Sequence, residues 1–356
     1  MPIKRFTGIS TRHLLDLPEE LEVHRSRVRI GKVIEFPREP DAAAFERLLP
    51  GFSARIETLH GRGLSVRQIL EELREYYGVD VTREAMLEVC DSLQQAARQW
   101  RQRPLAPRYA FVFVDSISVR VRELGGISDR TVHIALGILP DGGKDIIAFW
   151  FTPGTDIKAD AEFWSRATAE LKNRGVRDVL VAVAEDKANA AEAVQDAFPG
   201  AAVLTGPKHL IGRALATVAS KDKIAMGRAL DKTCAAADGK AAKLVLAAFA
   251  DETLGQRYPE AVAYWRQHWN DIAAFYALPP AVREVVRTTT AIESLTAKLR
   301  RRGVTRRGGF ASEEDAIRHL ILGLRDAGSG WKVAPGKWTA VRTQLVRQFA
   351  GRYLPD

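Results

Sequence analysis

The sequence predicts an α/β protein: a core with a mixed five-stranded sheet and helices, preceded by a helical domain and interrupted by an all-helical insertion. Three observations indicate this fold class. A very apolar segment begins at Tyr109, strand-like and helix-like patterns alternate from there to Thr205, and a long helical segment rich in Ala and Leu follows. A chain of 356 residues is long enough for two or three domains.

The composition indicates a globular protein of a reducing compartment. Hydrophobic residues make up 46% of the chain, and the two cysteines, Cys90 and Cys234, match no zinc-binding spacing. The first residues lack the apolar core of a signal peptide, and no apolar run is long enough to cross a bilayer. We therefore expect a cytoplasmic protein without a membrane partner.

Positive charge is concentrated toward the C-terminus. The net charge is +9, and residues 283–356 hold fifteen Lys or Arg against seven Asp or Glu, an excess of eight. A surface that only needs to stay solvated usually mixes both signs. The localised excess therefore predicts a polyanionic partner and favours nucleic acid, for which we expect double-stranded DNA.

The N-terminal third is predicted to be an arm and a helical domain. Residues 1–40 are polar and irregular, and we expect a weakly ordered arm there. In residues 41–107 we predict helices at Asp41–His60, Ser65–Gly78 and Thr82–Trp100. The spacing is compatible with a helix-turn-helix module and with a plain helical bundle, and only the charge favours the DNA-binding version.

The central strand runs from Tyr109 to Arg122. Its first half is apolar, as a strand buried on both faces requires, and its second half alternates apolar with polar residues. The elements predicted after it are strands at 131–139 and 145–152, a helix at 160–173, a strand at 178–184, a helix at 188–197 and a strand at 201–205. This order is that of a ribonuclease-H-like fold, so we assign residues 108–207 to the first part of such a core.

Residues 208–283 are predicted to be an all-helical insertion, because a structureless loop of that length is uncommon. Its Tyr and Trp residues are expected to form its core. Residues 284–356 then complete the core and carry the basic C-terminal region, with helices predicted at 288–302, at 312–325 and near 338–349.

Acidic residues mark a candidate metal site. Asp115 stands on the central strand where the pattern calls for another hydrophobe, and Glu185-Asp186 ends the fourth strand. Asp115 alone fits a hydrogen-bonded strand end as well as it fits a metal ligand. Parallel neighbouring strands would place these carboxylates side by side, and like charges that close need a cation between them. With Glu293 they would suit two Mg²⁺ or Mn²⁺ ions, although three acids among 44 are a weak signal by themselves.

Glu293 lies in a strongly basic segment. Between Arg287 and Arg307 it is the single acid among seven basic residues. The candidates for holding a DNA backbone are Lys298, Arg300, Arg301, Arg302, Arg306 and Arg307. The alternative is a solvated basic helix on which Glu293 balances charge, but no Lys or Arg lies three or four residues from it.

The chain resembles the Mutator-type bacterial transposases, the insertion-sequence-256 family. The resemblance extends over residues 38–349 and is carried by RPLAPRYAFVFVDSISVRVR, TVHIALGILPDG, FWSRATAELKNRGVRDVLVA, EAVQDAFPGA, TTTAIESL and GGFASEEDAIRHL. It implies a ribonuclease-H-like core, an Asp-Asp-Glu metal triad, a helical insertion before the Glu, and DNA strand transfer. By position, the first Asp falls on Asp115 and the Glu on Glu293.

The chain also departs from the family pattern. The second Asp is Glu185, and Asp186 stands where a glycine usually follows. The family's Cys-x-x-His begins here with Gly206 and keeps only His209, and a later Asn is Thr296. The longer Glu moves its carboxylate by about 1 Å, where catalytic placement tolerates roughly 0.5 Å. Which of Glu185 and Asp186 is the second metal ligand stays open.

The resemblance implies a DNA transposase that cuts insertion-sequence ends and joins them to target DNA, acting as a homodimer or higher oligomer on bacterial nucleoid DNA. Asp115, Glu185 or Asp186, and Glu293 would bind the metals. His209 would contact the scissile phosphate or orient a carboxylate, or it is simply a histidine satisfied at a helix start. The alternative is a transposase-derived DNA-binding protein with lost or impaired catalysis. A ribonuclease would fit the core but not the large insertion.

Overall fold

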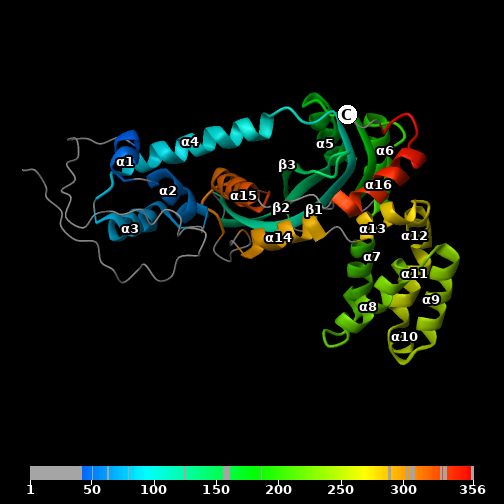
Figure 1. The fold of residues 1–356 in the computed structure, drawn as a ribbon. Coiled ribbons are helices and arrows are strands. Elements are labelled where there is room, and N and C mark those ends of the chain that lie inside the picture. The colour runs from blue at the N-terminus through cyan, green and yellow to red at the C-terminus, as the bar shows by residue number, and fades with distance from the viewer. Residues whose placement is uncertain are drawn as a thin grey trace, which may run out of the picture. The chain divides into compact units, whose positions relative to one another are not determined.

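The computed structural model describes residues 42–49, 51–61, 64–78, 80–123, 126–154, 161–185, 187–287, 290–301, 304, 309–328, 331 and 335–353. They form two compact units, with ribbon elements labelled in Figure 1. The helical unit contains the N-terminal helices with residues 299–306 and 310–325, and the sheet unit contains residues 103–298, 307–309 and 326–356. The predicted arm at 1–40 lies outside the described residues.

The sheet has five strands in the order β3-β2-β1-β4-β5. The strands are β1 (Arg108–Glu123), β2 (Gly126–Ile138), β3 (Lys144–Pro153), β4 (Asp178–Ala184) and β5 (Ala202–Thr205). Strands β1, β2 and β3 form an antiparallel meander, whereas β4 and β5 run parallel to β1. The predicted mixed five-stranded sheet is thereby confirmed, and its strand order and strand directions are consistent with a ribonuclease-H-like core.

The hairpin of β1 and β2 extends further than predicted. Its ladder continues to the pair Glu123 and Gly126, so β2 begins five residues before the predicted Thr131. These first residues of β2 are mostly exposed, Ile127 to 53%. Hydrophobic periodicity detects strands through their buried face, and these first residues of β2 have none that is fully buried.

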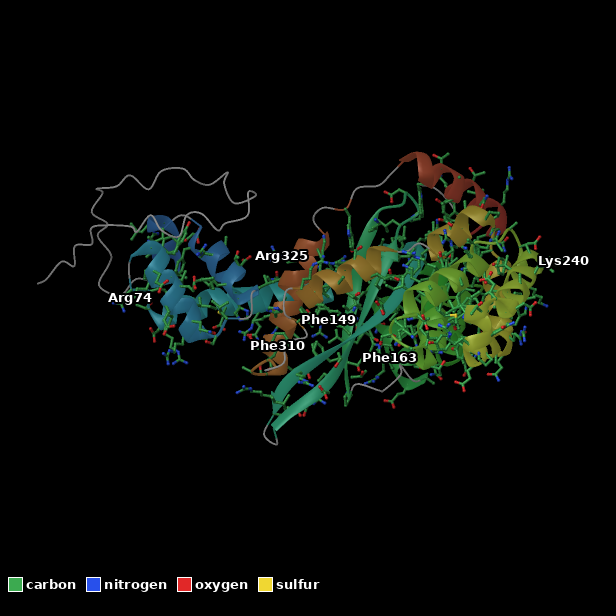
Figure 2. All side chains as sticks on the ribbon, turned by 90° about the horizontal axis from the view of Figure 1, so that it is seen from below. Arg74, Phe149, Phe163, Lys240, Phe310 and Arg325 are labelled. Atoms are coloured by element: carbon green, nitrogen blue, oxygen red, sulfur yellow. The ribbon has the colours of Figure 1, made fainter. Side chains whose placement is uncertain are left out.

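Helices α5 (Ala161–Asn173) and α6 (Lys187–Ala197) pack against the sheet. Phe163 of α5, labelled in Figure 2, places its ring 5.6 Å from that of Trp150 on β3 and 4.4 Å from that of His133 on β2. Trp338 of α16 (Pro335–Gln348) contacts Phe111 of β1 edge-on at 6.2 Å and donates a hydrogen bond to the Pro140 carbonyl oxygen. Sequence-distant helices therefore hold the central strand in place.

The predicted helical insertion consists of consecutive short helices. They are α7 (Pro207–Ala214), the 3₁₀ turn η3 (Leu215–Thr217), α8 (Lys223–Cys234), α9 (Gly239–Asp251), α10 (Thr253–Arg257), α11 (Pro259–Gln267), α12 (Trp269–Tyr276) and α13 (Pro280–Arg287). Trp265 is fully buried, as expected of a core aromatic. Tyr258 is only partly buried and donates a hydrogen bond of 2.7 Å to Asp222.

The helical unit contains α1 (Ala42–Leu48), α2 (Phe52–Gly61), α3 (Val66–Tyr77), α4 (Arg83–Gln102) and most of α15 (Glu313–Gly328). The single helix predicted for 41–60 is wrong, because the chain turns at Gly51, whose φ of 80° is left-handed. Pro50 precedes this turn, and a proline lacks the N–H that a continuing helix needs. The predicted capping box of Ser65 and Gln68 is confirmed at the start of α3.

The domain boundaries predicted from the sequence stay a prediction. The predicted helix around Glu293 corresponds to α14 (Thr290–Arg301), which begins in the sheet unit. Arg352, after α16, holds Asp178 at the start of β4 in a two-nitrogen ion pair and so fixes the end of the chain to the sheet. None of the described helices combines the length and the apolar character that crossing a membrane requires.

Candidate metal centre

The pairing of β1 with β4 brings two of the predicted acids together. Phe113 is in register with Val183, so two residues further along each strand Asp115 and Glu185 come level with one another. Glu185 follows directly after the last residue of β4 and is partly exposed, as is Asp115. The middle of β1 and the residue just after β4 thus supply two carboxylates from positions 70 residues apart in the sequence.

The third member of the site comes from the next strand and helix. After β5 the chain turns at Gly206, whose N–H donates to the Ala184 carbonyl oxygen at 3.0 Å, and α7 begins at Pro207. His209 lies in the first turn of α7. A Cβ on Gly206 would lie 2.9 Å from His209 Cδ2, so the imidazole ring occupies the space that a side chain at position 206 would take.

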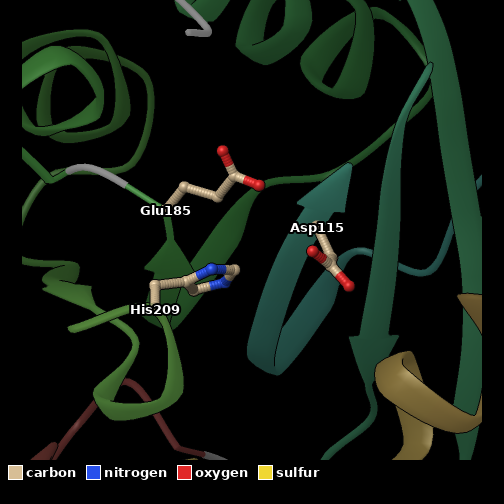
Figure 3. Close-up of side chains that lie close together, drawn as sticks. All are labelled: Asp115, Glu185 and His209. Atoms are coloured by element: carbon tan, nitrogen blue, oxygen red, sulfur yellow. The ribbon is translucent and has the colours of Figure 1, made fainter. Parts of the chain in front are cut away.

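These three side chains form a possible metal-binding group. One ligand atom from each of Asp115, Glu185 and His209 lies within 4.8 Å of the other two. Figure 3 shows the three side chains extending from β1, from the end of β4 and from α7 into the same region. Two carboxylate oxygens and an imidazole nitrogen are suitable ligands for a divalent cation, and two carboxylates this close repel one another unless a cation lies between them.

Ser116 orients both carboxylates and was not predicted. Its hydroxyl donates a 2.6 Å hydrogen bond to Glu185 Oε1, and its backbone N–H donates to Asp115 Oδ1 at 2.9 Å. Arg213 of α7 donates to the backbone carbonyl oxygen of Glu185 at 3.0 Å. Groups of this kind around metal ligands hold them in position. The sequence signal that could have predicted this role is the position of Ser116, a hydroxyl residue directly after the candidate ligand Asp115.

Helix α14 lies beside β1, but the carboxylate of Glu293 has a different partner. Thr296 is buried, and its Oγ1 lies 3.5 Å from Asp115 Oδ2 and 3.1 Å from the Glu293 carbonyl oxygen. The carboxylate of Glu293 forms an ion pair with the ammonium group of Lys208, the residue before His209. Among the described residues, the metal-binding group therefore contains His209 and the first two acids, and Glu293 is not one of its three members.

The remaining predicted residues fall into two sets. Lys298 is partly buried, with its Nζ 3.5 Å from the Ala327 carbonyl oxygen, and Arg300 and Arg301 are exposed on α14. Lying outside the described residues are Asp186, Arg302, Arg306 and Arg307. The position of Glu185 beside Asp115 supports Glu185 as the second metal ligand, and Asp186 is not tested because it lies outside the described residues.

Comparisons with known proteins agree on one family. The model of the transposase family called Mutator matches residues 42–334. The chain is 35% identical over 353 residues to the transposase for insertion sequence element ISRM3 of Rhizobium meliloti (strain 1021), covering 99% of this chain and 86% of that protein. It is 36% identical over 311 residues to a probable ISRM3-like transposase of Sinorhizobium fredii (strain NBRC 101917 / NGR234), covering 87% and 76%. It is also 22% identical over 321 residues to the transposase for IS256 in transposon Tn4001 of Staphylococcus aureus, covering 90% and 79%.

Proposed function

The chain belongs to the Mutator family of transposases, and we propose on that premise that it performs metal-dependent cleavage and strand transfer at insertion-sequence ends. The reaction class is phosphoryl transfer on DNA, of the Asp-Asp-Glu type, with Glu185 in the place of the second Asp. The observation that carries the proposal is the convergence of Asp115, Glu185 and His209 on one point. Their combination of donors fits a divalent cation better than it fits a charge-neutral structural role.

Asp115, Glu185 and His209 would hold the metal, for which we propose Mg²⁺ or Mn²⁺ because two of the three donors are carboxylate oxygens. A divalent ion held by these residues would supply Lewis acidity for activating a water or a 3′-hydroxyl and for stabilising negative charge on the phosphodiester. Ser116 keeps both carboxylates in place through its hydroxyl and its N–H. Glu293 would be the third acid of the centre, and Thr296 holds its helix, α14, beside Asp115.

Double-stranded DNA is the proposed partner, both as insertion-sequence end and as target. Lys298 and the exposed Arg300 and Arg301 would contact its backbone, together with Arg302, Arg306 and Arg307. Helices α3 and α4 would form the helix-turn-helix part that reads the ends. We further propose that the protein acts as a homodimer or higher oligomer on nucleoid DNA in the bacterial cytoplasm.

The test is a strand-cleavage assay on DNA that carries the inverted repeats flanking this gene, with Mg²⁺ or Mn²⁺. Asp115→Asn removes one ligand charge and is expected to lower the cleavage rate at least about a hundredfold, as displacement of a catalytic group does. Asp196→Asn is the matched control, because Asp196 is an exposed acid of α6 and its loss should leave the rate unchanged. Equal cleavage rates for both variants would show that Asp115 takes no part in the reaction.

A second function is favoured by one contact. Because Glu293 is paired with Lys208 and the second acid is Glu185, the chain could bind transposon ends without cutting them. This alternative predicts a gel-shifted complex with end-containing DNA and no nicked or joined product with either metal. Cleavage by the unmodified chain, lost in Asp115→Asn, would exclude it.

A further inference from the structure

The ion pair of Lys208 and Glu293 lies directly beside the metal-binding group. Lys208 precedes His209 in the first turn of α7, and Glu293 is in the first turn of α14, one turn before Thr296. The two side chains are 40% and 44% exposed, and the ammonium group contacts Glu293 Oε2. The ammonium group of Lys208 therefore binds the carboxylate of Glu293, which the family resemblance assigns to a metal ion.

This contact changes what Glu293 can bind. A lysine ammonium is a compact, strongly hydrated cation, and at contact distance it offsets the negative charge that would attract a divalent ion. Both groups reach solvent, so the pair is weak enough to separate but still competes with a second ion. The ligand set of Asp115, Glu185 and His209 includes neither residue and is not affected directly.

Two contacts within the protein hold α14 beside the metal-binding group. Thr296 places the helix beside Asp115 through its hydroxyl, and Lys208 attaches the carboxylate of Glu293 to α7. Carboxylates that lie close together need a nearby cation to offset their repulsion. Beside Glu293 that cation is the ammonium group of Lys208.

We propose that Lys208 is the built-in counter-cation of Glu293, so that the centre binds one divalent ion tightly and takes a second only when Lys208 is displaced. The inference rests on the proposed metal site of the transposase. It also departs from the two ions that the sequence predicts. Lys208 thus acts as a positioning residue, which sets the number of ions through Glu293.

The experiment is a Mn²⁺ titration of the full-length chain without DNA, in which electron paramagnetic resonance measures free Mn²⁺. The unmodified chain should bind one tight ion. Lys208→Met removes the charge and keeps an unbranched side chain, and it should bind a second ion at least about tenfold more tightly than the unmodified chain does. Lys208→Arg keeps the charge and should behave like the unmodified chain. Lys223→Met removes an exposed charge from α8 and should change nothing.

Two equally tight ions in the unmodified chain, or a titration unaltered by Lys208→Met, would overturn the inference. Circular dichroism establishes that each variant is folded, and Lys208→Gln replaces the methionine variant if that one is not. The outcome is separable from the proposed function. Cleavage of DNA by a chain with two equal ions would sink the inference alone, whereas one ion with no cleavage would sink the proposed function alone.

Discussion

At the scale of single residues, the candidate centre depends on what is missing at position 206. Gly206 has ordinary backbone angles, φ −61° and ψ 132°, so any residue could adopt its conformation. What excludes a side chain is space, because an added Cβ would lie 2.9 Å from His209 Cδ2 and 3.2 Å from Val183 Cγ1. A glycine at position 206 is therefore what leaves room for the present position of the histidine ring.

Gly206→Ala should displace the His209 ring and weaken Mn²⁺ binding by about 10- to 100-fold, the usual effect of disturbing a group that positions a metal ligand. Gly212→Ala, within α7, is the matched control, because nothing lies within 4 Å of a Cβ added there. Both affinities can be measured by the Mn²⁺ titration. Unchanged binding in Gly206→Ala would mean that His209 is not a ligand.

At the scale of elements, a buried polar cluster joins α2 to α15 within the helical unit. His60 Nε2 lies 3.4 Å from Asp315 Oδ1, and His319 Nδ1 contacts the His60 carbonyl oxygen at 3.0 Å. Burial lowers the pKa of His60 below 6.5, and Arg318 and His319 lower it further, while Asp315 opposes the shift. The helix pair therefore contains a histidine that gives up its proton more readily in the folded state than a free histidine does.

A histidine whose pKa is lowered by folding takes up its proton more readily in the unfolded chain. The helical unit should therefore lose stability as the pH falls below about 6.5, and the pH should have no such effect above that value. Hydrogen exchange of α2 and α15, compared at about pH 7.5 and about pH 5.5, measures this local stability. His60→Asn should reduce the difference in local stability between the two pH values. An undiminished difference would mean that other groups cause the pH dependence.

Element boundaries show where periodicity is informative. The capping box of Ser65 lies where the sequence predicts it, and so does the cap in which the Ala85 N–H donates to Thr82 Oγ1, because these bonds join residues three apart. The turn at Gly51 was missed, because the hydrophobic face continues through it from Phe45 to Phe52. Pro50 and Gly51 are a local signal for the break, but the apolar pattern that continues across them points to one helix.

At the scale of the whole molecule, the charge excess in residues 283–356 should determine DNA affinity. Replacing Arg300, Arg301 and Arg302 with Ala should weaken DNA binding and lower the slope of log K against log salt by about 0.9 for each DNA phosphate that the variant no longer neutralises. Gel shifts across a salt series measure both quantities. Replacing the exposed Arg166, Lys172 and Arg177 of the α5 region removes equal charge and should alter the slope less. An unchanged slope in the variant that lacks Arg300, Arg301 and Arg302 would show that these arginines do not contact DNA phosphates.

The sequence by itself determined the sheet, the helical insertion, the family and the two acids, Asp115 within β1 and Glu185 directly after β4. Apolar runs and their periods are properties of neighbouring residues, and Asp115 is conspicuous because it interrupts such a run. The tertiary structure decided which groups surround those acids. Ser116 reaches Glu185 across 69 residues, and Lys208 reaches Glu293 across 85. Periodicity specifies which face of an element is buried, but not which distant side chain it meets, since that depends on strand order and helix placement.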